Sequence, residues 1–237
     1  MPDWPDDAEA LDAEQRRLAA LSPELWTPPL GTLRAAGAFV AFARGEQGPG
    51  RPGDHEWVGA ALVAMPDVRV LAQAVVQARA GARYDRGRLA LREGPALAAA
   101  ITALGSPDVV LVDATGRDHP RGAGLALHLG AVLDVPTVGV THRPLLAQGA
   151  WPLEEPGASS PLVLGSTEVG AWLRTSAHAR PLAVHAGWRT DVATAVDVVR
   201  HCVAGARTPE PLRQARIAAR VARARAEGAP PEDRRIP

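Results

Sequence analysis

Apolar positions in the middle of the chain predict a βαβ unit. Residues 109–112 (VVLV) form a short apolar run rich in β-branched side chains, which is typical of a strand buried on both faces. A second run of this kind occupies residues 137–140, and a helical pattern lies between them at about 123–133. Segment 107–140 is therefore expected to fold as strand, helix and strand.

The first of these strands ends directly in a carboxylate, Asp113, followed by a turn-rich segment, ATGRDHP. Open α/β sheets place their sites at the carboxyl ends of strands, so Asp113 is a candidate site residue. An ordinary loop that happens to begin with aspartate would show the same pattern.

The rest of the chain predicts further strands around this unit. Three apolar runs joined by short turns, at 35–43, 57–65 and 68–76, predict an antiparallel meander. A later hairpin at 162–164 and 170–174 and a strand at 181–184 follow. Helices are expected at 8–21, where Asp7 can act as the cap, and from Pro95 to about 104, at 191–203 and at 211–227.

These elements predict one α/β domain over residues 8–226, with a mixed sheet, helices on both of its faces and flexible ends at 1–7 and 228–237. The ribonuclease H-like arrangement is one option of this type.

Charge excludes a global electrostatic attraction to nucleic acid or membranes. The 237 residues include 26 basic and 26 acidic ones, so the formal net charge is zero. Every basic residue is arginine, and any anion must therefore be bound by local arginine patches.

The lone cysteine, Cys202, excludes an intrachain disulfide and lies in an apolar helical pattern, so we expect a buried thiol. The acidic N-terminus lacks the apolar region of a signal peptide, and no window approaches the length of a membrane span. We therefore expect a cytoplasmic protein with no membrane partner.

Three blocks in fixed order resemble the endonuclease V family: YDRGRLALREGP (84–95), PDVVLVDATGRDHPRGAGLALHLG (107–130) and VPTVGV (135–140). The resemblance covers roughly residues 8–226. It implies a ribonuclease H-like fold with a mixed five-stranded central sheet flanked by helices. It also implies a monomer that uses Mg²⁺ or Mn²⁺ to cut DNA or RNA on the 3′ side of a deaminated base, typically hypoxanthine, the base of inosine.

The resemblance assigns roles to residues of these blocks. Glu93 and Asp113 fall on catalytic and metal-binding carboxylates of the family. Tyr84 falls on the tyrosine of a wedge that separates the strands at the lesion. The expected contacts to nucleic acid and the damaged base are Tyr84, Arg92, Gly116, His119, Arg121 and His142, the last in place of a lysine.

Two positions depart from the family pattern. The first metal-binding aspartate is replaced by Phe39, whose side chain has no oxygen to bind a metal. We assign the position of the catalytic histidine to Trp188, whose indole cannot accept a proton. Asp191 is a candidate third metal ligand, with a helix N-terminal charge as the alternative. His185 is expected to be structural.

Arginines form two clusters with opposite expectations. Those at 79, 83, 86, 88 and 92 surround Tyr84, so contact with phosphates is favoured over a solvated face. Those on the C-terminal helix, at 213, 216, 220 and 223, are expected to face solvent.

Two functions compete on this evidence. The favoured one is an endonuclease V-like protein that binds DNA or RNA, with inosine-containing nucleic acid as the candidate partner, and in which cleavage is impaired. The alternative is an active Mg²⁺- or Mn²⁺-dependent endonuclease with a site rebuilt from Glu93, Asp113 and Asp191. A scaffold without any nucleic-acid role is a third possibility.

Overall fold

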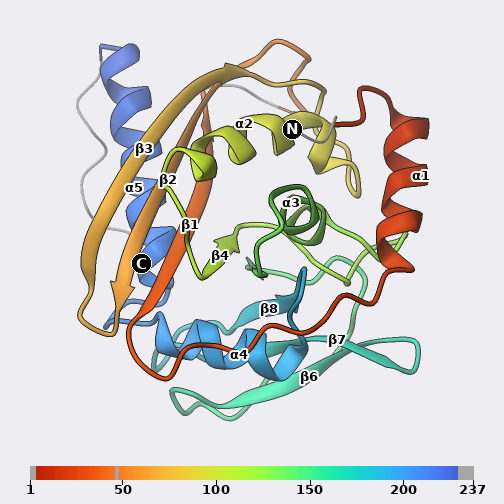
Figure 1. Cartoon of the computed structure of the whole chain (residues 1–237), viewed down its shortest axis with the longest axis vertical. Helices are drawn as coiled ribbons and strands as arrows, with labels where there is room; N and C mark the ends of the chain where they lie inside the picture. Colours follow the sequence, from red (N-terminus) through yellow and green to blue (C-terminus); the bar gives the residue numbers. More distant parts are fainter. Residues whose placement is uncertain (1–3, 46–47, 229–237) are drawn as a thin grey trace.

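The apolar runs of the sequence assemble into one mixed sheet of eight strands, in the order β3-β2-β1-β4-β5-β8-β7-β6 (Figure 1). The computed structural model describes residues 4–45 and 48–228. The strands are β1 Leu33–Phe42, β2 His55–Met65, β3 Arg69–Arg79, β4 Val109–Val112, β5 Thr137–Thr141, β6 Ser159–Leu164, β7 Thr167–Leu173 and β8 Leu182–Ala186.

The three central strands share one direction, because β1 pairs with β4 and β4 with β5 in parallel, whereas every other pairing is antiparallel. Their carboxyl ends therefore meet at one edge of the sheet. Ala38 pairs with Val112, so the next residues along, Phe39 and Asp113, are neighbours at this edge.

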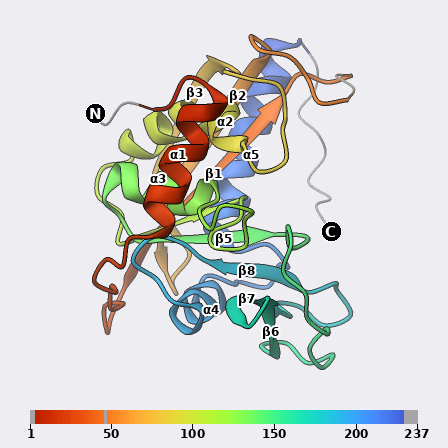
Figure 2. The same ribbon diagram turned by 90° about the vertical axis from the view of Figure 1, so that its right-hand side faces the viewer.

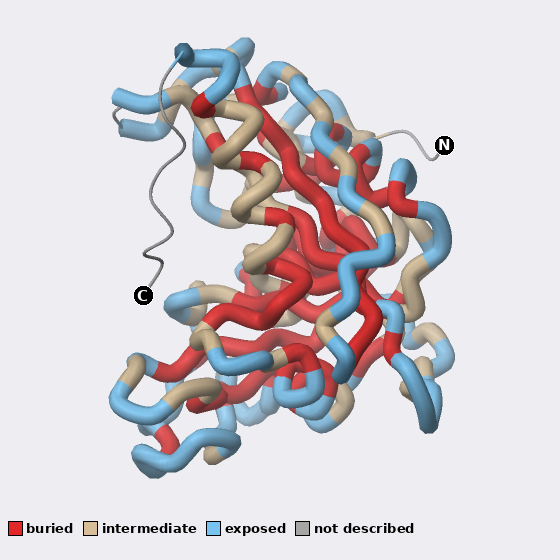
Figure 3. Tube along the Cα trace, turned by 90° about the vertical axis from the view of Figure 1, so that its left-hand side faces the viewer, coloured by how far each residue is buried: buried red, intermediate tan, exposed pale blue. Residues whose placement is uncertain are grey.

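Helices cover both faces of the sheet (Figures 1 and 2). On one face, α2 (Leu89–Thr102) and α3 (Leu125–Leu133) pack on the central strands, and α1 (Ala8–Ala19) packs against these helices. On the other face lie α4 (Val192–His201) and α5 (Glu210–Ala226). Buried residues form a continuous band through the middle of the molecule (Figure 3).

Two glycines allow α5 to lie directly on the strand backbone. A Cβ added to Gly37 in β1 would be 2.2 Å from the Pro211 carbonyl carbon, and one added to Gly59 in β2 would be 2.2 Å from the Ala215 carbonyl oxygen. Real Cβ atoms do not approach so closely, so a larger residue at either position would push α5 away. This approach sets how far the side chains of α5 reach into the sheet.

The mixed α/β arrangement and all the expected strands are confirmed, but the sheet has eight strands, because β6, β7 and β8 continue it beyond β5. Asp7 caps α1 as expected, its Oδ1 accepting from the Ala10 N–H. The expected helix start at Pro95 is wrong: α2 begins at Leu89 and continues through the proline.

The expectation of a loose N-terminus is also wrong for part of segment 1–7. The Trp4 ring stacks on His128 of α3, with 4.7 Å between ring centroids, and covers Gly94 of α2. Residues 1–3 and 229–237 lie outside the described residues. Among the described residues, no helix is both long and apolar enough to cross a membrane.

Candidate functional site

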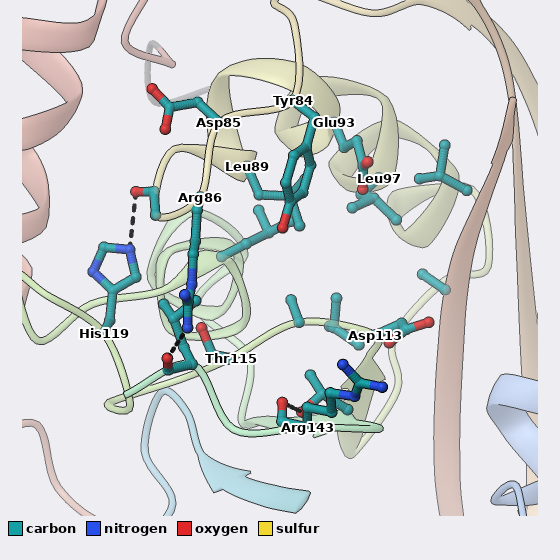
Figure 4. A pocket seen from close by; sticks show the side chains of 18 of the residues that line it. Tyr84, Asp85, Arg86, Leu89, Glu93, Leu97, Asp113, Thr115, His119 and Arg143 are labelled. Atoms are coloured by element: carbon teal, nitrogen blue, oxygen red, sulfur yellow. Dashed lines mark hydrogen bonds between the residues drawn. The ribbon is translucent and has the colours of Figure 1, made fainter. Parts of the chain in front are cut away.

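A cavity of about 620 Å³ opens at the edge where β1, β4 and β5 end, between this edge and the loop that precedes α2 (Figure 4). A second cavity of about 400 Å³ adjoins it and shares Phe39, Tyr84 and Glu93 in its lining. Together we call these cavities the cleft. The sheet topology thus places the cleft where the sequence pattern predicted a site.

The structure brings Glu93 and Asp113 into the same cavity, Glu93 from α2 and Asp113 from the end of β4 (Figure 4). Burial raises the pKa of Glu93 to about 8, and the neighbouring Glu56 and Asp113 carboxylates add to this effect while Arg92 opposes it. Near pH 7 Glu93 is therefore mainly a neutral acid.

Glu56 is a buried carboxyl that sequence analysis missed. It lies in β2 near Glu93, is 1% exposed, and its Oε2 has no hydrogen-bond partner among the residues that the structure describes. Burial raises the pKa of Glu56 to about 7, and nearby Arg92 limits the rise. Glu56 precedes the apolar run at 57–65 from which this strand was predicted, and a single acid before a strand gives no signal of a functional site.

Asp113 lies deep in the cleft, although about a third of its side chain, 36%, still contacts solvent. Loss of bulk water raises the pKa of Asp113, against the opposing influence of Arg216 and then of His142. Asp113 was expected to be a site residue because it follows the carboxyl end of β4, and its position at the cleft agrees with this expectation.

The place beside Asp113 is filled by an aromatic ring and an arginine. Arg216 comes from α5, and its guanidinium carbon lies 4.8 Å from the centroid of the Phe39 ring, in cation–π contact. Its Nη2 lies 3.9 Å from Asp113 Oδ2. The expectation that Arg216 faces solvent is wrong, because only 12% of its side chain is exposed.

These residues do not fit a Mg²⁺ or Mn²⁺ ion. Among the residues that the structure describes, no group of three or more His, Cys, Asp or Glu side chains is placed to hold a metal. Phe39 supplies no oxygen, and the Arg216 guanidinium puts a positive charge next to Asp113. A permanent cation beside one of the two remaining carboxyl groups opposes the binding of a hard divalent cation, which depends on anionic oxygens.

The assignment of the catalytic histidine position to Trp188 is not supported by the fold. Trp188 follows β8 at the edge where β5 begins, and its backbone N–H donates to Thr137 Oγ1 at 2.9 Å. Asp113 lies at the other edge, where β4 ends. The Trp188 side chain packs against α1 and α3, so the local Ala-Gly-Trp match misled because it ignored strand direction.

Asp191 also lies away from the carboxylates of the cleft and does not line either cavity. It is the N-cap of α4, where its Oδ1 accepts a hydrogen bond from the Thr194 N–H at 2.8 Å. This bond lowers its pKa. The alternative role, a negative charge at a helix N-terminus, therefore describes Asp191.

The loop that carries Tyr84 is fixed by a network around one carbonyl, that of Gly87. Three side chains donate to it: Gln15 Nε2 at 3.2 Å, His119 Nε2 at 2.9 Å and Arg121 Nη2 at 2.6 Å. Tyr84 itself is 52% exposed, and its ring reaches into the cavity (Figure 4). An exposed aromatic on a fixed loop is suited to stacking on a base.

His119 and Arg121 take part in this network with defined roles. His119 Nε2–H donates to Gly87, so Nδ1 accepts from the Arg121 N–H at 3.2 Å, and burial lowers the pKa of His119 to about 4. The imidazole is therefore neutral near pH 7. Arg121 also donates to Gln15 Oε1 at 2.6 Å, which makes it a support of the loop.

Three further residues that were expected to contact nucleic acid lie outside the network around Gly87. Arg92 is 4% exposed, stacks 4.1 Å from the Phe42 ring centroid and pairs with Asp54, so it joins strand and loop. A Cβ on Gly116 would lie 1.9 Å from the Ala186 carbonyl oxygen, which makes this glycine a packing requirement. His142 is exposed near Asp113, and its Nδ1 accepts from Arg207 at 2.8 Å.

The opposite wall of the cavity is formed by Thr141 and by Arg143, Pro144 and Leu145, none of which was predicted as a site residue. Asp118 is fully buried beneath it and accepts from the backbone N–H groups of Leu145, Leu146 and Ala147 at 2.6, 2.9 and 2.8 Å. Arg86 donates to the Leu145 carbonyl, and Arg143 projects into the cavity (Figure 4). The irregular segment after β5 carries no periodic signal, so only the fold reveals this wall.

Comparison with known proteins identifies relatives of this chain. The sequence model of the Endonuclease V family matches residues 36–217. Endonuclease V of Methanopyrus kandleri is 40% identical over 201 residues, which are 84% of this chain and 83% of that protein.

Solved structures agree with this similarity. The crystal structure of Endonuclease V from Streptomyces avermitilis is 32% identical, with a TM-score of 0.83 and 96% and 97% of the two chains covered. The Ciona intestinalis Endonuclease V structure, 17% identical with a TM-score of 0.77 over 92% and 98% of the chains, contains a 24mer DNA with an inosine followed by a ribo-adenosine. At this identity the likeness shows the fold alone.

Proposed function

The chain belongs to the endonuclease V family, and we propose that it binds nucleic acid containing a deaminated base while cleaving it very slowly or not at all. The observation that carries this proposal is the pair of Phe39 and Arg216 beside Asp113, where a metal-dependent nuclease needs anionic oxygens.

Binding is supported by the wall of the cleft opposite these residues. Tyr84 offers an exposed ring on a loop fixed through Gly87, and the cavity beside it has room for a base at about 620 Å³. Arg86 and Arg143 line the same cavity and add positive charge near the expected path of a backbone. The family relatives are endonucleases by name, and the Ciona protein was crystallised with inosine-containing DNA.

Among the described residues, the cleft lacks the chemical groups that hydrolysis of a phosphodiester needs. Cleavage of a phosphodiester requires an activated water and stabilisation of the leaving oxygen. Glu93 is mainly protonated near pH 7, and both nitrogens of His119 are engaged in hydrogen bonds. Arg216 is a permanent cation that can attract a phosphate but cannot take a proton from water.

The rebuilt active site is not favoured, because Asp191 caps α4 and leaves only Glu93 and Asp113 as carboxylates of the expected set. Two such ligands hold a magnesium ion weakly unless a substrate adds its own oxygens.

One pair of assays tests the proposal. DNA and RNA oligonucleotides with a single inosine, and matched ones with guanosine, are incubated with Mg²⁺ or Mn²⁺, and cleavage and binding are measured in parallel. We expect binding that prefers inosine, with no cleavage above background. Cleavage that is lost in the Asp113→Ala variant would contradict the impairment, and equal failure to bind every oligonucleotide would contradict the nucleic-acid role.

A further inference from the structure

Arg216 is a buried guanidinium whose hydrogen-bonding capacity is not used within the described residues. Its Nε is buried without a partner, and its Nη2 approaches Asp113 Oδ2 only to 3.9 Å, beyond hydrogen-bond distance. The flat face of the group rests on the Phe39 ring. The N–H groups at its edge are therefore available to an acceptor that enters beside Asp113.

Positive charge exceeds negative charge around this position. Arg220 and Arg207 lie close enough to interact electrostatically with Arg216, whereas Asp113 is the acid that favours its charged form. His142 and Glu93 also face Asp113: partial loss of solvent and then Arg207 lower the pKa of His142, and burial raises that of Glu93 to about 8, so both are mainly neutral near pH 7. Arg207 and Arg216 place two guanidinium groups near the one Asp113 carboxylate, and this excess of positive charge attracts an anion.

The position adjoins the cleft through Asp113. Asp113 lines the larger cavity and also a narrow pocket of about 10 Å³ in which it meets Phe39 and Arg216. A backbone that follows the cleft past Tyr84 would therefore pass the Asp113 carboxylate, 3.9 Å from Arg216 Nη2. Arginine matches phosphate well because its fork presents two parallel N–H donors.

We propose that Arg216 replaces the divalent cation at Asp113 and binds a phosphodiester group of the nucleic acid, so that binding does not require a metal. This inference rests on the proposed function, because it assigns how the same cleft holds its ligand. The guanidinium provides a fixed positive charge from α5, balances Asp113 in the free protein, and turns to the phosphate when the backbone enters.

The test is the affinity for a 5′-labelled, inosine-containing oligonucleotide in EDTA and in Mg²⁺, measured by fluorescence anisotropy. The wild type should bind equally in both. Arg216→Gln should weaken binding about tenfold, the usual effect of losing a charge-assisted hydrogen bond, and should lower the salt slope by about one. Arg216→Lys should lose less, since it keeps the charge.

The matched control is Arg225→Gln, which removes the same charge from an exposed position on α5. It should leave the affinity within about twofold, as expected for a side chain that makes no contact to the backbone. Thermal unfolding of each variant shows that the fold is retained.

The outcomes separate the two proposals. No binding by the wild type overturns the proposed function and, with it, the role of Arg216. Wild-type binding that Arg216→Gln and Arg225→Gln reduce equally, or that EDTA abolishes, overturns the role of Arg216 alone.

A metal titration provides a readout independent of nucleic acid. The electron paramagnetic resonance signal of free Mn²⁺ should be unchanged by the wild type and reduced by the double variant Phe39→Asp/Arg216→Gln, which exchanges the ring and the cation for a carboxylate and an amide. Stoichiometric Mn²⁺ binding by the wild type that Asp113→Ala removes would overturn the inference.

Discussion

The two walls of the cleft are built in different ways. The wall with Tyr84, which we call the loop wall, is fixed by hydrogen bonds that converge on Gly87. The wall with Phe39 and Asp113, the acid wall, is held by a cation–π contact and a long ion pair from Arg216. Within the described part of the chain, Arg216 Nε is buried at this wall without a hydrogen-bond partner.

This difference shows that shape and chemistry can change separately in one site. The loop wall retains residues of the family blocks with their donors and acceptors paired. The two carboxyl groups, Glu93 and Asp113, are both partly removed from solvent, which raises the pKa of each, and Arg216 lies beside Asp113. Substitutions on each wall and beneath the cavity therefore test the comparison.

The largest effect is expected for Asp118→Ala, beneath the segment that faces the loop wall. This change removes the acceptor of three backbone N–H groups, and we expect a loss of about 3–5 kcal/mol in the free energy of unfolding. Urea unfolding measures it. Asp118→Asn keeps one acceptor oxygen and should lose about half as much, whereas a loss below about 1 kcal/mol in the alanine variant would show that the segment is held by other contacts.

A smaller effect is expected for Glu93→Gln on the acid wall, and it should depend on pH. The pKa of Glu93 is raised from 4.5 to about 8, so its stabilising contribution is complete below pH 4.5 and is lost as pH rises through 8. The wild type should thus lose stability relative to the variant between these pH values, on the order of 2 kcal/mol after allowance for screening.

Urea unfolding at pH 4.5 and pH 8.5 measures this difference. The control is Glu24→Gln, which removes the same charge from an exposed loop and should leave the pH dependence as it is. Parallel curves for the wild type and Glu93→Gln would show that Glu93 ionises freely.

The smallest effect is expected for Gln15→Ala, which removes one of the donors to Gly87 and the acceptor of Arg121. The remaining donors keep the loop in place, so we expect about 1 kcal/mol of lost stability and about threefold weaker oligonucleotide binding. Glu9→Ala, at an exposed position on the same helix, serves as the control. A large loss of binding would mean that the loop wall depends on α1 far more than its hydrogen bonds indicate.

Much of the fold was predictable, because buried strands and short turns leave strong local patterns. The βαβ unit fixed the direction of β4 and β5 and placed Asp113 at the correct edge. The start of α2 was not predictable in this way: Pro95 is a common first helical residue, yet here the helix already begins at Leu89.

The site was harder to predict, because its residues come from segments that only the fold brings together. Arginines at helical spacing on α5 indicate a solvent-facing side, and nothing local distinguishes Arg216 from Arg213, which pairs with Glu210 at 2.6 Å. Trp188 was misplaced for the same reason, since a short sequence match carries no information about which end of a strand it follows.

The contact of α5 with the bare backbone at Gly37 and Gly59 has a consequence for how this protein can diverge. Because the helix axis is held at a fixed depth, the length and charge of a single side chain at position 216 decide what meets the Asp113 carboxylate. An exchange there can swap a permanent cation for a neutral or acidic group without moving a strand. A substitution at residue 216 can therefore change the chemistry of the cleft while the fold stays the same.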